Sequence, residues 1–386
     1  MSIPYWRLSS FYFFYFAALG SFTPYWSLYL KNVGFNNVEI GEQFALLVGV
    51  RILASNFWGW IADHTERRLL IIRTTSLISA MVFASFMWAK GYLWFAGITV
   101  ALSFFWNAGL PQFETVTLLH LKEEPQRYSK IRLWGSIGFI VAVSSVGEAI
   151  DRFSSAVLPI AITALLALTG FSALFVPKAH SAQHDAEPVG FLRLLFKTEV
   201  LMFLLVGMLV QVAHTPYYVF YSIYLKQQHY AGSIIGGLWA LGIVAEILLF
   251  LVMKRLQTRF SMRSIFLTSL LLSIVRWLLI GFFPENLYLL LSAQLLHAAT
   301  FGGVHVASIH FVRMYFGKLH QGKGQALYAS LCFGLGGMIG SFYGGYFWDK
   351  AGADFVFSIG ACACALALLL SFIWIGRNPH RFNAFS

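Results

Sequence analysis

The chain contains two nearly identical copies of one short segment. Trp26–Lys31 is followed after nine residues by Gly41, and Tyr221–Lys226 is followed by Gly236 at the same spacing. The two copies lie 195 residues apart in a chain of 386 residues. Each copy ends a long apolar run, so the sequence predicts two halves with one architecture and one orientation.

The composition places these halves in a membrane. The chain is 58% hydrophobic and 11% charged, whereas a soluble domain is about 25% charged. The apolar runs are continuous rather than alternating, which favours membrane-spanning helices over a β-barrel. Twelve runs are long enough to span, at about 8–30, 40–62, 69–89, 92–119, 131–150, 155–176, 199–225, 232–253, 262–283, 286–312, 324–348 and 353–376.

The basic residues indicate an orientation. Of 27 lysines and arginines, three lie inside spans, five lie at alternate loops, and the other nineteen lie at the remaining loops and the two termini. By the positive-inside rule this asymmetry predicts a multi-pass membrane protein with both termini in the cytoplasm. The net charge of +11 is therefore not read as a sign of nucleic-acid binding.

These patterns predict an all-α integral membrane fold of twelve transmembrane helices in two pseudo-symmetric six-helix bundles. The expected parts are an N-terminal bundle at 1–176, a cytoplasmic linker at 177–198 and a C-terminal bundle at 199–386. Phe191–Phe196 is expected to form a short surface helix. The other loops are short, and no metal, nucleophile or phosphate-binding motif is present, so an enzyme is not expected.

Charged and polar residues inside the spans are the candidate functional groups, because each one costs a few kcal/mol in lipid unless it has a partner or a cavity. In the tenth span, Gln294, His297, Phe301 and His305 step by three, four and four and should share one helical face. Such a ladder beside a carboxylate can hold a proton. The alternative is a set of histidines that bond backbone carbonyls between packed helices.

Glu246 lies in the middle of the eighth span, at the position that the repeat relates to Arg51. We expect it to pair with Arg276 of the ninth span and to be released when a proton binds. His297 and His305 would then act as relays. A static buried ion pair is the alternative.

The stretch Gly59–Arg68 resembles the signature loop of the major facilitator superfamily. Asp63, Arg67 and Arg68 match its pattern, whereas His64 replaces a basic residue and Glu66 replaces a glycine. The resemblance implies a conformational latch in which the carboxylate pairs with arginines at the helix ends.

Ile131–Phe139 is similar to the start of the fifth helix in lactose permease, where a glutamate eighteen residues before the arginine binds substrate with it. Glu114 stands eighteen residues before Arg132 here. Further segments match the phenylpropionate permease branch: Tyr128–Phe139, Ala213–His214, Tyr217–Tyr218, Leu238–Glu246, Arg276–Trp277 and Leu295–Ala298. The chain therefore resembles this branch, the proton symporters for aromatic acids, more closely than it resembles lactose permease. One departure is clear: His297 is followed after three residues by Thr300 and not by the carboxylate of lactose permease.

The resulting expectation is a secondary transporter that couples uptake of a small organic solute, an aromatic or other organic acid first, to protons by alternating access. Sugar or nucleoside symport, export and a non-transporting sensor are the alternatives. No cofactor is expected, and protons are the expected coupling ion. The expected partners are the solute and membrane lipid, with the chain as a monomer. The expected substrate-binding residues are Glu114, Arg132, Arg51, Gln112, Phe139 and His214, and those for proton coupling are Glu246, Arg276, His297 and His305.

Overall fold

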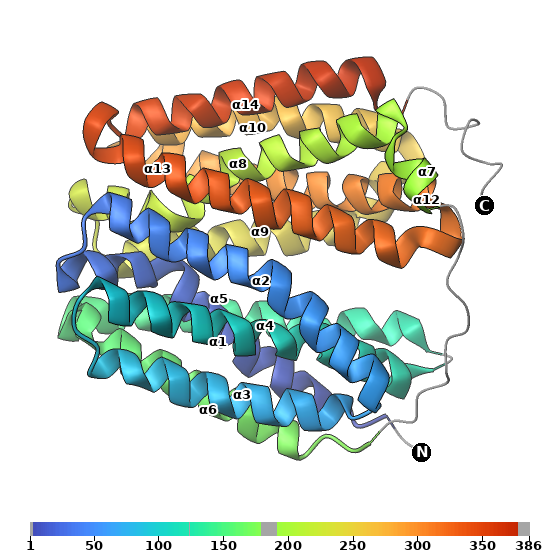
Figure 1. Cartoon of the computed structure of the whole chain (residues 1–386). Helices are drawn as coiled ribbons and strands as arrows, with labels where there is room; N and C mark the ends of the chain where they lie inside the picture. Colours follow the sequence, from blue (N-terminus) through green and yellow to red (C-terminus); the bar gives the residue numbers. More distant parts are fainter. Residues whose placement is uncertain (1–2, 123, 179–190, 377–386) are drawn as a thin grey trace. The chain divides into compact units, whose positions relative to one another are not determined.

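The computed structural model describes residues 3–122, 124–178 and 191–376, and every regular element in those ranges is helical (Figure 1). The helices before residue 179 are α1 (Tyr5–Val33), α2 (Asn37–Thr65), α3 (Arg68–Ala84), α4 (Tyr92–Leu121), α5 (Tyr128–Phe153) and α6 (Leu158–Leu174), with short 3₁₀ turns η1 (Ser85–Met87), η2 (Pro125–Arg127) and η3 (Ser155–Val157).

The second group begins with a short helix and contains two π-helical stretches, η4 and η5. Its elements are α7 (Phe191–Leu195), α8 (Thr198–Gln227), α9 (Gly232–Arg259), α10 (Met262–Phe282), α11 (Leu287–His297), η4 (Ala298–Gly303), α12 (Val304–Tyr328), η5 (Ala329–Gly336), α13 (Gly337–Ala351) and α14 (Ala353–Trp374). The short helix expected at Phe191–Phe196 is α7.

Eleven helical segments in the described residues are long and apolar enough to cross a membrane. Two of them are composite: one runs through α11, η4 and α12 to Gly317, where the backbone leaves helical geometry, and the next runs from His320 to Ala351. The remaining expected span is α1. It has 29 residues, but tyrosine, serine and proline interrupt its apolar run. The all-helical membrane fold is confirmed.

The helix starts repeat as the duplicated segment predicts. α2 begins at Asn37 and α9 at Gly232, 195 residues apart. The pairs α4 and α11, and α6 and α14, begin at the same offset. Gly41 and Gly236, the glycines of the repeated motif, therefore occupy the same turn of their helices.

The turn between α1 and α2 shows how the sequence ends one helix and starts the next. Gly34 takes a left-handed conformation, φ 110°, and closes α1 with hydrogen bonds to Leu30 and Lys31, as glycine does most readily. Asn36 then accepts from the Glu39 amide while the Glu39 carboxylate accepts from the Asn36 amide. This capping box satisfies two helix-end donors.

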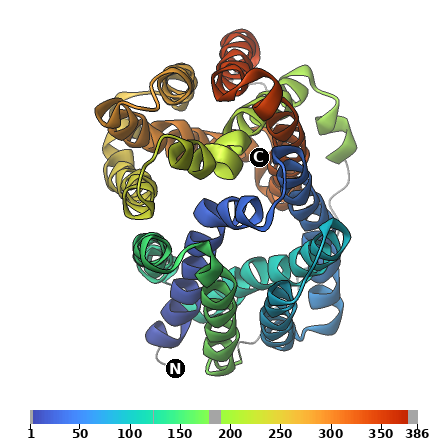
Figure 2. The same ribbon diagram turned by 90° about the vertical axis from the view of Figure 1, so that its left-hand side faces the viewer.

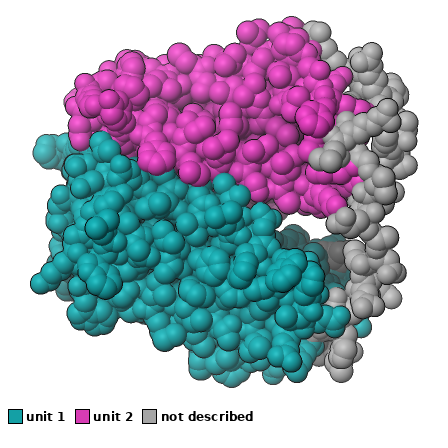
Figure 3. Space-filling model, in the orientation of Figure 1, with its two compact units in different colours: residues 1–184, 225–240 teal, residues 185–224, 241–386 magenta. Residues whose placement is uncertain are grey.

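The chain forms two compact units, coloured separately in Figure 3. Unit 1 contains Met1–His184 and Leu225–Ala240, and unit 2 contains Asp185–Tyr224 and Leu241–Ser386. Residues 225–240, expected in the second bundle, thus cluster with the first. Most of the linker expected at 177–198 lies outside the described residues.

Close helix contacts in unit 1 depend on glycine. α1 packs along α5 and α6, and α3 packs against α4 and α6 (Figure 2). A Cβ added at Gly138 of α5 would lie 2.2 Å from the Phe13 carbonyl oxygen of α1. At Gly20 of α1 it would lie 2.7 Å from the Phe139 carbonyl oxygen. Only glycine allows the two backbones to come this near.

One loop position carries backbone strain that a substitution should relieve. Glu66, which stands where the signature loop has glycine, caps α2 with φ 55°. The left-handed conformation costs an ordinary residue about 1–2 kcal/mol. We expect Glu66→Gly to raise the free energy of unfolding by up to about 1 kcal/mol, once the extra entropy of an unfolded glycine is subtracted.

The thermal unfolding temperature of the purified protein in detergent measures this effect, with Glu66→Ala as the matched control. Alanine removes the same carboxylate but keeps the strained backbone. Equal unfolding temperatures for the two variants would contradict the explanation from backbone strain.

Candidate functional site

Unit 1 holds a charged cluster among aromatic rings, built from α1, α4 and α5. Glu114 of α4 accepts a hydrogen bond of 3.2 Å from the Tyr128 hydroxyl at the start of α5. The Arg132 guanidinium of α5 lies 3.7 Å from the Phe16 ring centroid and 5.7 Å from that of Tyr12, both on α1. The carboxylate and guanidinium are near enough for mutual attraction. We call these five residues the unit-1 cluster.

Gly135 provides the space that this arrangement needs. A Cβ added there would lie 2.7 Å from an Arg132 terminal nitrogen and 2.8 Å from a Phe16 ring carbon. The motif Arg-Leu-Trp-Gly therefore places a glycine beneath the guanidinium, so that the arginine can lie flat on the phenylalanine face. Such stacking contributes about 0.5–2 kcal/mol.

Three residues expected to bind substrate lie elsewhere in unit 1. Arg51 is exposed on α2. Phe139 is buried, with its backbone against Gly20 at the α1–α5 contact. Gln112 is buried and accepts a hydrogen bond from Arg68. The buried Tyr15 of α1 lies within electrostatic reach of both Arg51 and Arg132.

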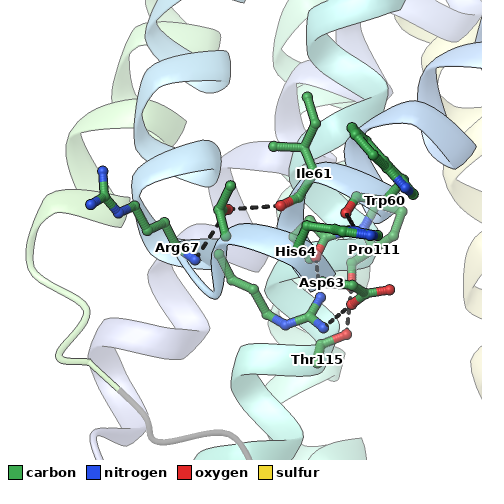
Figure 4. Close-up of polar contacts among 10 residues, drawn as sticks. Trp60, Ile61, Asp63, His64, Arg67, Pro111 and Thr115 are labelled. Carbon is green, nitrogen blue, oxygen red and sulfur yellow. Dashed lines mark hydrogen bonds and ion pairs between the residues drawn. The ribbon is translucent and has the colours of Figure 1, made fainter. Parts of the chain in front are cut away.

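The signature loop is organised by the second of its two arginines. Arg68 forms an ion pair with Asp63 and also donates to Gln112 of α4. Arg67 points its guanidinium away from Asp63 (Figure 4), and its backbone amide donates to Thr65 at 3.4 Å. Gln112 therefore belongs with the expected latch, because it connects the α2–α3 loop to α4. The latch role itself stays a prediction.

Unit 2 brings Glu246 and His297 together. The carboxylate of Glu246 on α9 lies 3.9 Å from Nε2 of His297 on α11, and their side chains are 16% and 6% exposed. Two glycines permit this approach. A Cβ at Gly242 would lie 3.3 Å from the His297 ring, and one at Gly302 would lie 3.3 Å from the Glu246 side chain.

The expected ion pair between Glu246 and Arg276 is not among the ion pairs of the described residues. Arg276 is fully buried and donates instead to the Ala293 carbonyl at 3.0 Å and the Thr300 hydroxyl at 3.3 Å. Its guanidinium lies 4.3 Å from the Tyr217 ring centroid. The physical reason is local: backbone and hydroxyl acceptors on the α11–η4 segment occupy the guanidinium, while His297 takes the place beside the carboxylate.

The ladder on the tenth span is confirmed for its ring-bearing members. The rings of His297 and Phe301 stack at 5.4 Å, those of Phe301 and His305 at 6.1 Å, and both pairs are within 8° of parallel. Gln294 accepts a hydrogen bond of 2.9 Å from the Tyr217 hydroxyl. The π-helical stretch η4 begins directly after His297, and such stretches frequently mark functional sites.

A small cavity in unit 2 lies between two histidines. Its lining includes His214 of α8 together with Thr300 and His305, and its volume of about 20 Å³ suits one water molecule. His214 donates from Nδ1 to the Val210 carbonyl at 2.9 Å and meets the Trp277 ring edge-on at 4.7 Å. Its Nε2 is buried and has no hydrogen-bond partner in the described structure.

Several residues of these clusters were not predicted as site residues. Tyr12, Phe16 and Tyr128 surround the unit-1 charges, and Trp277 and Thr300 adjoin Arg276. Each of them is an aromatic or hydroxyl residue in a chain rich in both. The one sequence signal that could have indicated any of them is a position next to a charged residue, as Trp277 directly follows Arg276.

Comparisons with known proteins agree with this architecture. Residues 5–359 match the model of the MFS_1 like family. The protein named "Probable 3-phenylpropionic acid transporter" from Escherichia coli K12 is 28% identical over 93% of this chain and 95% of its own. The maltose permease of Geobacillus stearothermophilus is 27% identical over 93% of this chain and 92% of its own.

Solved structures share the fold. The nucleoside transporter NupG superposes with a TM-score of 0.82 at 18% identity, covering 97% of this chain and 98% of that one. The POT family transporter PepTSo superposes with a TM-score of 0.79 at 12% identity, covering 98% of each chain. The relatives are transporters and not enzymes. A family match over nearly the whole length, and two units that each enclose charged groups within a membrane-spanning bundle, show that this chain belongs to the MFS_1-like family of major facilitator transporters.

Proposed function

We propose that the protein is a proton-coupled symporter of a small organic acid, with an aromatic carboxylate as the favoured substrate. The observation that carries this proposal is the contact between Glu246 and His297 inside unit 2. A carboxylate and an imidazole within 4 Å of each other, the imidazole buried and the carboxylate partly buried, can share one proton. The similarity to the 3-phenylpropionic acid transporter supports the choice of substrate.

In this proposal the unit-1 cluster and the Glu246–His297 pair have different roles. The unit-1 cluster binds the polar part of the solute through Arg132 and Glu114, and its rings contact an apolar body. The Glu246–His297 pair takes up the proton, and His305 continues the ladder as a relay. Asp63, Arg67 and Arg68 act as the latch during alternating access. The setting would be a bacterial inner membrane, with both termini cytoplasmic, the chain a monomer and protons the coupling ion.

A sugar or nucleoside is the second candidate substrate. Glu114 favours it, because a carboxylate accepts hydrogen bonds from hydroxyl groups and repels an anion. The maltose permease and the nucleoside transporter among the similar proteins support it as well.

Proton coupling predicts a pH signal when solute is added. Addition of 3-phenylpropionate to lightly buffered cells that express the protein should alkalinise the medium, because each solute carries a proton inward. Glu246→Gln should abolish that signal and accumulation against a gradient, while exchange of internal for external solute continues. A pH electrode and labelled solute measure both effects.

The matched control is Glu148→Gln, which removes an exposed carboxylate that pairs with Arg152 at the end of α5. This variant should behave as the unchanged protein does. Accumulation against a gradient at the normal rate by Glu246→Gln would rule out the proton role. The absence of solute-dependent alkalinisation for any tested solute would favour a non-transporting sensor.

Glu114→Gln separates the two substrate classes. If the solute is an acid, loss of the neighbouring negative charge should leave its affinity unchanged or improve it. If the solute is a sugar or nucleoside, affinity should fall roughly 10-fold or more, since hydrogen bonds to charged groups contribute about 1.5–3 kcal/mol.

Competition by 3-phenylpropionate, maltose and uridine against a bound reporter ligand measures this difference in the purified protein. An unchanged affinity for every ligand that the protein binds, neutral ones included, would remove Glu114 from the site.

A further inference from the structure

The turn between α9 and α10 is the counterpart of the signature loop in the second half of the chain. The offset of 195 residues relates Gly59–Arg68 to Lys254–Arg263. Thr258 and Ser261 stand where the first copy has its aspartate and its glutamate. The second copy therefore contains four lysines and arginines and no carboxylate.

The basic side chains of this turn lack acidic partners. Lys254, Arg255 and Arg259 are exposed, and none of them takes part in an ion pair among the described residues. In the first copy the last arginine pairs with Asp63, whereas its counterpart Arg263 donates to a carbonyl oxygen near the end of α14 at 2.7 Å. Like charges four residues apart on a helix repel each other, so the turn is stabilised by any anion that binds between them.

An exposed apolar stripe on α9 leads to the same turn. Leu248, Leu251 and Val252 are exposed, Leu251 to 73%. Arg255 and Arg259 continue their face of the helix at steps of three and four residues. An exposed apolar face of a membrane-spanning helix contacts lipid tails, which are as apolar as leucine. One face of α9 thus presents an apolar wall for acyl chains and, beyond it, two guanidinium groups.

We propose that the α9–α10 turn binds the phosphate headgroup of an anionic phospholipid, which takes the place of the carboxylate that the first copy contains. Arg255 and Arg259 hold the phosphate, because paired guanidinium donors match its oxygens. Lys254 adds a third positive charge. The positive-inside pattern predicts that this turn faces the cytoplasm, where anionic headgroups attract lysine and arginine.

Two features of the surroundings favour a lipid. Phe260, next to Arg259, is 54% exposed, as is common for aromatic residues at the boundary between membrane and water. Free phosphate would use the guanidinium groups and leave the apolar stripe without a role. One carboxylate does face the last arginine of the turn, because Glu199 of α8 and Arg263 both lie within electrostatic reach of Tyr315. Arg263 is therefore not assigned to the lipid.

Binding of short-chain lipids to the purified full-length protein in a non-ionic detergent tests the inference. The labelled probes are dioctanoyl phosphatidylglycerol, which is anionic, and dioctanoyl phosphatidylcholine, which has no net charge. We expect the anionic lipid to bind about 10-fold more tightly or better. The double variant Arg255→Gln/Arg259→Gln should weaken its binding roughly 30-fold, about 5-fold for each charge. The same variant should bind phosphatidylcholine unchanged, which also shows that it is folded.

Two matched comparisons separate a lipid site from a general effect of charge. Lys31→Gln/Lys90→Gln removes two exposed positive charges elsewhere and should bind both lipids as the unchanged protein does. Thr258→Asp provides the carboxylate that the first copy has at Asp63, and it should weaken binding of phosphatidylglycerol roughly 5-fold. Thr258→Asn has a similar size without the charge and should leave that binding unchanged.

The inference does not depend on the transported solute or on the coupling ion. Equal binding of the two lipids by the unchanged protein would overturn it, and so would an equal loss in the two double variants. If inorganic phosphate displaces phosphatidylglycerol at an equal molar concentration, the turn is a site for free anions and the assignment to lipid is wrong. Unchanged binding in Thr258→Asp would show that the phosphate does not replace a carboxylate. Each of these results leaves the proposed symport standing, because that proposal is tested by solute-dependent alkalinisation.

Discussion

The account depends on the cost of holding a charge away from water. Each ionised group inside a membrane-spanning bundle must find a counter-ion, a set of hydrogen bonds or an aromatic face. The described residues meet this cost in two ways. In unit 1 a guanidinium stacks on Phe16 beside a carboxylate. In unit 2 a carboxylate meets a histidine while the guanidinium relies on neutral acceptors and rings. The second arrangement is the less balanced one, and it contains the pair to which we assign the proton.

Glycine is what lets these groups approach one another. Gly135 makes room for the arginine of unit 1, and Gly242 and Gly302 bring α9 and the tenth span together around Glu246. Helices that pack this closely leave no slack for an added methyl group. The π-helical stretch η4 lies at the same place. The π-helical stretch, the glycine contacts and the carboxylate–imidazole pair therefore coincide in one part of unit 2.

Sequence reasoning reached the fold and the unit-1 pair but misplaced the partner of Glu246. The duplication and the apolar runs are patterns that extend along the whole chain. Few backbone structures are stable in a bilayer, so such patterns are enough to predict the fold. Glu114 and Arg132 were related through the resemblance to lactose permease, in which a glutamate stands eighteen residues before the matching arginine. Glu246 and Arg276 were paired on charge alone. Which of two nearby groups a carboxylate meets depends on side-chain direction and on acceptors such as the Ala293 carbonyl, which no residue pattern reveals. The hydrogen bond between Gln112 and Arg68, 44 residues apart, was likewise not predictable from the sequence pattern, and the substrate role of Gln112 stays a prediction.

The central claim is that the Glu246 carboxyl group is protonated when solute is bound. Infrared difference spectroscopy of the protein in native-like bilayers observes this directly, since a protonated carboxyl group has its own carbonyl band. The account predicts that adding 3-phenylpropionate produces such a band, that it shifts in heavy water, and that it vanishes in Glu246→Gln. A band of unchanged size in that variant would place the proton elsewhere and contradict the account.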